Sequence, residues 1–231
     1  MNSSSGHIAA PGAPRQGPFR YPGRRVPWET LAFGVFLGYF EAACVAYLRR
    51  LQDLGQLGVP VGSLDNRLLR IEVGREAASL GLLAAWAWAA GRTRGERLGH
   101  FALAFAVWDI LYYVFLRLTT GWPQSLMEWD VLFLIPAPWY GPVVTPVLVA
   151  LLLAAAGLGI VAGERAGRRL APRAADLLLV GGGVAGVLAA FLWNAAVTAP
   201  LPSYFPWWLF AAGWLAAAGG LTRLVAGMRE S

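Results

Sequence analysis

The sequence predicts an all-α integral membrane protein, a bundle of six transmembrane helices with one short re-entrant or interfacial segment. Hydrophobic residues make up 57% of the 231 residues and charged residues only 14%, whereas soluble domains carry about 25% charged residues. Apolar runs recur along the chain, each of about the length that crosses a hydrocarbon core of roughly 30 Å. All 19 basic residues are arginines, and they concentrate in alternate loops between these runs.

The predicted elements divide the chain into a tail and a membrane domain. Residues 1–26 are rich in Ser, Gly, Pro and Arg and contain no apolar run, so we expect a disordered cytoplasmic tail. Residues 27–231 form the membrane domain. Its six spans are expected at about 28–48, 74–91, 97–118, 140–163, 174–198 and 205–227.

Each span has a feature that supports it. The first is expected to act as an uncleaved signal anchor, and the second is short and begins with the charged pair Arg75 and Glu76. The third carries Asp109 near its middle. The fourth begins with prolines, which the first turn of a helix tolerates. The fifth holds a glycine cluster, and the sixth opens with Trp207 and Trp208, whose rings favour the membrane interface.

The short segment 125–135 lies between the third and fourth spans. It is about eleven residues long, too short to cross a bilayer, and Pro136 and Pro138 close it. Non-helical backbone at membrane depth needs surrounding protein or water. We therefore expect this segment to lie against the bundle. It also repeats a short pattern, because Trp129-Asp130 echoes Trp108-Asp109.

The distribution of arginines predicts the orientation. If the N-terminus is cytoplasmic, thirteen arginines fall on the cytoplasmic side and six on the outer side, as the positive-inside rule requires. Both termini are then cytoplasmic. The bias towards Ala, Arg and Gly is typical of GC-rich bacterial genomes, so the expected location is the cytoplasmic (inner) membrane. The net charge of +6 thus reflects topology, and the expected partner is the lipid bilayer, with no nucleic acid.

Polar residues at membrane depth are the main functional clue. With this topology, five polar groups from five segments fall in the outer half of the bilayer: Glu41, Glu76, Asp109, Asp130 and Asn194. A charged side chain facing lipid costs about 2.5–3.5 kcal/mol at the centre of a helix. We therefore expect these groups to face one another in an outward-facing pocket that binds a substrate or ion.

Other residues are expected to border or support this pocket. Arg75 and Arg117 lie at the outer ends of their spans, and either can pair with Glu76, Asp109 or Asp130; Arg75 is assigned to the site. The supporting residues are Ser79, Trp108, Tyr112, Tyr113 and Trp129. Gly34, Gly38 and Glu41 share one helix face, which should pack closely inside the bundle. His100 is expected to be a solvated residue near the inner surface.

Residue counts exclude several kinds of chemistry. Without lysine there is no Schiff base, so retinal and pyridoxal phosphate (PLP) are disfavoured. One cysteine and two histidines disfavour iron–sulfur clusters and haem. No cofactor is evident, no catalytic residue is named, and any metal would need mainly carboxylate ligands.

Three functions remain open at this stage. The leading one is binding or passage of a small cation, a proton or a polar solute. The second is an accessory subunit of a larger membrane complex or a homo-oligomer, supported by the glycine faces, which suit close helix packing. The third is a carboxylate- or metal-dependent enzyme at the outer leaflet, although the sequence leans against an enzyme.

Overall fold

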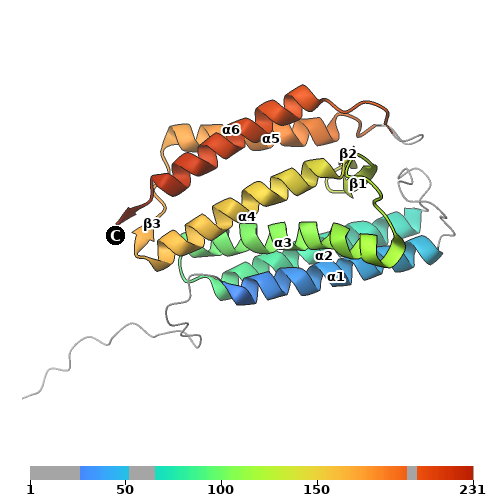
Figure 1. The fold of residues 1–231 in the computed structure, drawn as a ribbon, viewed down its shortest axis with the longest axis horizontal. Helices are drawn as coiled ribbons and strands as arrows, with labels where there is room; N and C mark the ends of the chain where they lie inside the picture. The colour runs from blue at the N-terminus through green and yellow to red at the C-terminus, as the bar shows by residue number, and fades with distance from the viewer. Residues whose placement is uncertain (1–26, 52–65, 197–201, 231) are drawn as a thin grey trace, which may run out of the picture.

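The computed structural model describes residues 27–51, 66–196 and 202–230. Most of these residues are helical (Figure 1). The six helices are α1 (Trp28–Leu51), α2 (Asn66–Ala90), α3 (Arg94–Thr120), α4 (Val144–Arg165), α5 (Ala174–Leu192) and α6 (Trp207–Ala226). The tail predicted for residues 1–26 lies outside the described residues.

Five of these helices are long and apolar enough to cross a membrane, by length and composition. They are α1, α3, α4, α5 and α6. The exception among the six is α2, whose first half carries several charged residues, including Arg67, Arg70 and Glu72. The prediction of a mostly helical chain with long apolar helices that could span a membrane is therefore confirmed, and the sixth crossing stays a prediction.

The prediction of an all-α chain is wrong in one respect, because two small antiparallel sheets accompany the helices. β1 (Trp129–Phe133) pairs with β2 (Trp139–Pro142), and β3 (Arg168–Arg169) pairs with β4 (Arg229–Glu230). The segment predicted as re-entrant or interfacial contains β1, and it packs against the helices at one end of the bundle (Figure 1). Trp108-Asp109 lies on a helix and Trp129-Asp130 on a strand, so the two pairs are not copies of one structural unit.

Three predicted boundaries shift for local reasons. The fourth span was expected from residue 140, but residues 139–142 form β2 and α4 begins at Val144. Pro146 then occupies the first turn of α4, where no helical hydrogen bond needs its missing N–H. α2 begins eight residues before the predicted span because Arg and Leu are good helix formers even where hydropathy is low. α5 ends at Leu192, short of the predicted residue 198, which is not described.

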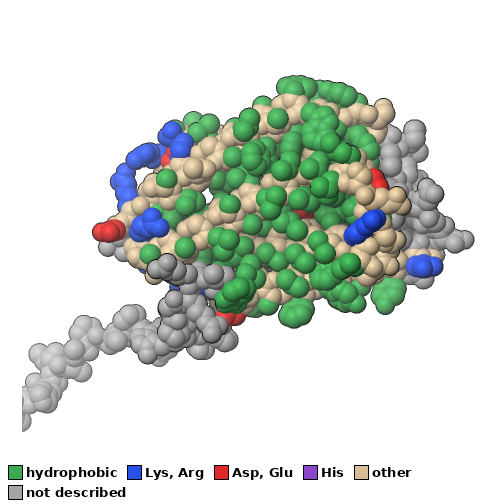
Figure 2. Space-filling model, in the orientation of Figure 1, with side chains coloured by type: hydrophobic (Ala, Val, Ile, Leu, Met, Phe, Trp, Pro, Cys, Tyr) green, Lys and Arg blue, Asp and Glu red, His purple; other side chains and the backbone are tan. Residues whose placement is uncertain are grey.

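The helices alternate in direction, so α1 begins and α6 ends at the same end of the molecule (Figure 1). That end also holds β3 and β4, and we call it the terminal end; the opposite end, with β1 and β2, is the hairpin end. α3 is central and packs against α1, α2 and α4, while α5 and α6 pack mainly on each other. Figure 2 shows hydrophobic side chains over the middle of the visible face and basic side chains at both ends, most densely at the terminal end.

Glycines allow the closest helix contacts. A Cβ on Gly183 of α5 would lie 2.3 Å from the backbone nitrogen of Ala217 on α6, and one on Gly213 of α6 would lie 2.7 Å from that of Val187. Gly34 and Gly38 of α1 similarly pack on α3. The sequence-predicted glycine faces are thus largely used within the chain.

Candidate functional site

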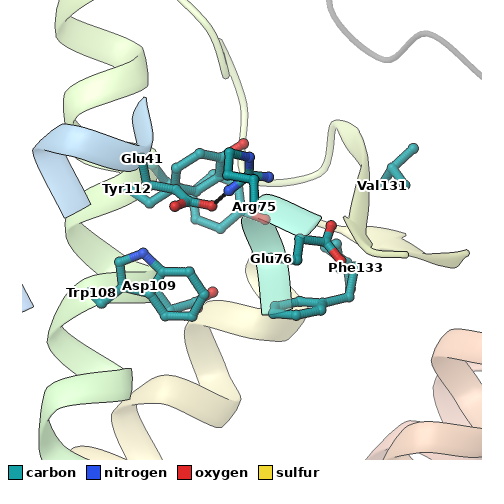
Figure 3. Close-up of a pocket in the computed structure, with 10 residues that line it drawn as sticks. Glu41, Arg75, Glu76, Trp108, Asp109, Tyr112, Val131 and Phe133 are labelled. Atoms are coloured by element: carbon teal, nitrogen blue, oxygen red, sulfur yellow. Dashed lines mark ion pairs between the residues drawn. The ribbon is translucent and has the colours of Figure 1, made fainter. Parts of the chain in front are cut away.

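A polar pocket lies between α1, α2, α3 and β1 (Figure 3). Its cavity measures about 50 Å³ and is partly open. The residues around it are Glu41, Arg75, Glu76, Trp108, Asp109, Tyr112, Tyr113, Val131, Leu132 and Phe133. The structure therefore brings Glu41, Arg75, Glu76 and Asp109 together from three helices.

Glu41 on α1 is held by two side chains of α2. Figure 3 shows Arg75 and Glu41 pointing towards each other, and they form an ion pair. Ser79 donates its hydroxyl to Glu41 Oε2 at 2.9 Å. Glu41 is only 4% exposed, and its position follows from the close contact of Gly34 and Gly38 with α3, which turns this face of α1 inwards.

Arg75 also binds Glu72, which sequence reasoning did not assign to the site. Its Nε donates to Glu72 Oε2 at 2.8 Å, and its Nη2 lies 2.7 Å from the same oxygen. Arg75 was expected to pair with Glu76, Asp109 or Asp130. Its ion pairs are instead with Glu41 and Glu72. The spacing of the sequence could have identified Glu72, because Glu72, Glu76 and Ser79 recur at helical intervals that place them on one face of α2.

Glu76 connects α2 to the β-hairpin. Its Oε2 accepts a hydrogen bond from the backbone N–H of Leu134, just after β1, at 2.9 Å. The ring of Phe133 packs edge-on against Trp108 of α3, with the ring centroids 6.2 Å apart. Val131, Leu132 and Phe133 give the pocket an apolar wall on this side, and sequence reasoning did not assign these three residues to the site.

Asp109 and Trp108 place unpartnered polar atoms at the pocket. Asp109 Oδ2 and Trp108 Nε1 are buried and have no hydrogen-bond partner within the described structure. Buried polar atoms are normally hydrogen-bonded. Asp109 Oδ2 is an acceptor when the carboxylate is ionised and Trp108 Nε1 is a donor, so each would take a hydrogen bond from or to a small polar ligand.

Asp130 does not line the cavity but contacts Tyr113, which does. It is 5% exposed, and Tyr113 donates its hydroxyl to Asp130 Oδ2 at 3.0 Å. Tyr113 itself lines the cavity together with Tyr112. Asp130 therefore belongs to the same polar cluster through Tyr113.

Two predicted residues lie away from the cavity. Asn194 follows α5 and donates its side-chain N–H to the carbonyl of Tyr204 at 2.9 Å, and it does not line the pocket. Trp129 packs edge-on against Phe205, with the ring centroids 6.2 Å apart. The expected depth of a residue in the membrane does not determine which way its side chain faces. Neither Asn194 nor Trp129 therefore lines the pocket.

A second polar cluster joins the same three helices nearer the terminal end. His100 of α3 is 2% exposed, so the expectation of a solvated histidine is wrong. Its Nδ1 lies 2.7 Å from Thr30 Oγ1 of α1, and Trp86 of α2 donates its indole N–H to that oxygen at 3.1 Å. Sequence reasoning missed Thr30, although it lies eleven residues, about three turns, before Glu41 and so on the same helix face.

The described residues around the pocket do not form a metal-binding site. Among the residues that the structure describes, no group of three or more His, Cys, Asp or Glu side chains is arranged to hold a metal ion. The carboxylates instead bind an arginine, a serine, a tyrosine and a backbone amide.

Comparisons with known proteins found no match: no family model fits the chain, and neither the curated proteins nor the solved structures include a significant relative.

Proposed function

We propose that this protein crosses a membrane six times and that its carboxylate pocket binds protons for passage across the bilayer. α2 is the sixth crossing in this proposal, because its 25 residues extend about 37 Å at 1.5 Å per residue. Its charges face the pocket or lie near one end. The dense arginines at the terminal end support a cytoplasmic location for that end, in a bacterial inner membrane.

The observation that carries the proposal is the pair of unpartnered atoms at the cavity, Asp109 Oδ2 and Trp108 Nε1. A water molecule can accept from the indole and donate to the carboxylate. Water beside a buried carboxylate supplies a path by which that carboxylate gains and loses a proton. Intramembrane acids in such settings are characteristic of proton relays.

The charge of the cluster favours a positively charged ligand. Glu41, Glu76 and Asp109 line the cavity together with Arg75, Glu72 binds Arg75, and Asp130 joins the cluster through Tyr113. Burying more carboxylate charge than the nearby cation balances is costly unless the acids take up a proton or another cation. The cluster is thus chemically suited to bind positive charge.

The size of the cavity limits the ligand. At about 50 Å³ it has room for a few water molecules, since each needs roughly 10–15 Å³ by this measure. A proton carried on water fits, as does a small monovalent cation, whereas a lipid headgroup or a sugar does not fit in this conformation. These dimensions therefore support the smallest of the ligands considered from the sequence.

No specific observation on the described residues supports the subunit hypothesis or the enzyme hypothesis. The subunit hypothesis rested on glycine faces, and contacts within the chain now account for most of them. For the enzyme hypothesis, the described residues add no specific observation beyond the carboxylates themselves. We therefore propose proton passage alone.

Flux measurements in proteoliposomes test this proposal. Vesicles loaded with a pH-sensitive dye receive an imposed potential, and proton entry is compared for wild type, Asp109→Asn and Glu76→Gln. We expect either variant to lower the flux by about tenfold or more, as for loss of an ion-binding acid in a membrane. The exposed Glu230→Gln is the matched control. Equal flux in wild type and both pocket variants, or movement of Na⁺ or K⁺ without protons, would overturn the proposal.

A further inference from the structure

The pocket and the His100 cluster lie on the same faces of α1 and α2. On α1, Thr30 and Glu41 are eleven residues apart, close to three full turns. On α2, Ser79 and Trp86 are seven residues apart, close to two turns. The two clusters are thus successive polar layers along one helix–helix interface.

An apolar layer separates them. Leu37 of α1, Leu83 of α2 and Ala104 of α3 are buried in one hydrophobic cluster. Leu83 and Ala104 are completely buried, and Leu37 is 7% exposed. On α3, His100, Ala104 and Trp108 follow one another at four-residue intervals and so share a stripe. The order along the interface is therefore polar cluster, apolar layer, carboxylate pocket.

Three helices give a consistent spacing between the two polar layers. Thr30 to Glu41, Glu76 to Trp86 and His100 to Asp109 each correspond to about 14–17 Å at 1.5 Å per residue. This is roughly half of a 30 Å hydrocarbon core. The carboxylate pocket covers the part of the interface nearer the hairpin end, and the His100 cluster covers the part nearer the terminal end.

His100 has one ring nitrogen available for a ligand. Nδ1 is bonded to Thr30 Oγ1, and Nε2 is buried without a hydrogen-bond partner among the described residues. The charged groups that act on the ring are Glu29 of α1, Glu96 of α3 and Arg165 of α4, while α2 contributes the indole of Trp86 to the cluster. Imidazole exchanges protons near neutral pH more readily than any other side chain.

We infer that the Thr30–His100 cluster is a second proton-binding site, separated from the carboxylate pocket by the layer of Leu37, Leu83 and Ala104. The role of this second site rests on the proposed passage of protons, but the existence of the site does not. His100 binds a proton at a ring nitrogen to become imidazolium and releases the same proton to return to neutral imidazole. The apolar layer must admit water for the two sites to exchange protons, so it acts as the gate between them.

Nitrogen-15 NMR of labelled histidine tests the site directly. The chain has two histidines, so a His7→Ala protein in lipid nanodiscs reports His100 alone. The ring shifts distinguish imidazolium from the two neutral tautomers, and we expect reversible protonation as the pH is lowered from about 9 to about 3. Thr30→Val removes the hydroxyl partner and should change the tautomer populations. A single neutral tautomer throughout this range, in a protein that stays folded, would overturn the second site.

Flux measurements then test its role. His100→Asn keeps a polar group near Thr30 but has no second ring nitrogen, and we expect proton flux to fall by about tenfold, as for loss of a relay group. His7→Ala is the matched control. Wild-type flux retained within twofold in His100→Asn would overturn the relay role. Absence of proton flux in the wild type would instead reject the proposed function, while the NMR titration would still decide whether the second site exists.

Discussion

Arg75 of α2 forms an ion pair with Glu41 of α1, across two helices that otherwise share few contacts. Both side chains are largely buried, at 18% and 6% exposed. The pair, with the hydrogen bond from Ser79 to Glu41, is therefore the principal polar link between α1 and α2. It also forms one side of the cavity, so the same residues hold the helices together and shape the pocket.

Replacing Arg75 should destabilise the protein more than replacing Glu41. Arg75→Gln leaves both Glu41 and Glu72 without their cation, and loss of one partner from a buried pair costs about 3–5 kcal/mol. Glu41→Gln leaves Arg75 bound to Glu72 and keeps an acceptor for Ser79, so we expect about 1–3 kcal/mol. Reversible unfolding in mixed detergent micelles measures the free energy of unfolding.

A second ion pair provides the control for this comparison. Arg223 of α6 lies 2.8 Å from Asp176 of α5, but its side chain is 53% exposed. Arg223→Gln should therefore cost no more than about 1 kcal/mol, as for surface pairs. Equal losses for Arg75→Gln and Arg223→Gln would contradict the assignment of the Arg75 ion pair as a buried link.

Gly183 should be far less tolerant of a methyl group than its neighbour Gly182. A Cβ at Gly183 meets the backbone of α6 at 2.3 Å, whereas one at Gly182 meets nothing within 4 Å. Gly183→Ala should force α5 and α6 apart at a cost of about 1–3 kcal/mol. Gly182→Ala should be neutral or stabilising by up to about 1 kcal/mol, since alanine favours helix. Thermal unfolding of both variants tests this, and similar melting temperatures would contradict the packing of α5 on α6.

Glu76 should anchor the hairpin through its oxygen atom and not through its charge. Glu76→Gln keeps an acceptor for the N–H of Leu134, so the hairpin should stay in place although proton flux falls. Glu76→Leu leaves that N–H unpaired, at a cost of about 1–3 kcal/mol. Hydrogen exchange at the Leu134 amide should be faster in Glu76→Leu alone. Equally fast exchange in both variants would mean that charge, not hydrogen bonding, holds the hairpin.

Cysteine labelling tests the six crossings and their orientation. In a Cys44→Ser background, Arg94→Cys and Ala166→Cys should react only after cells are permeabilised, because both lie at the terminal end. Arg50→Cys and Ser203→Cys should react in intact cells. Labelling of Arg50→Cys and Arg94→Cys from the same side would show that α2 does not cross, and reversal of all four would show the opposite orientation.

Much of the fold follows from composition and spacing, and the exceptions have physical causes. Apolar runs locate five membrane-length helices, because a helix is the single-segment structure that satisfies its own backbone in lipid. Residues 140–142 were assigned to a helix because apolar residues suit strands and helices alike. In the structure they pair with β1, a long-range contact that local sequence does not specify.

The candidate site, like the fold, could be predicted from the sequence only in part. The expected depth of Glu41, Glu76 and Asp109 and the cost of exposing charge to lipid were sufficient to expect them to meet, and they line one cavity. Asn194 was expected at the same depth, but its side chain donates a hydrogen bond to the carbonyl of Tyr204 instead. Its direction depends on how α5 packs, and that packing is set by the close contact of glycines on α5 and α6.

By itself the sequence determined that the chain has apolar segments of membrane-spanning length with acids among them, because composition and the cost of burying charge need no coordinates. The tertiary structure decided which acids share the arginine, which buried polar atoms have no partner among the described residues, and that His100 is buried beside Thr30. Those features depend on the rotation of each helix about its axis, which is set by close packing between helices that are distant in the chain.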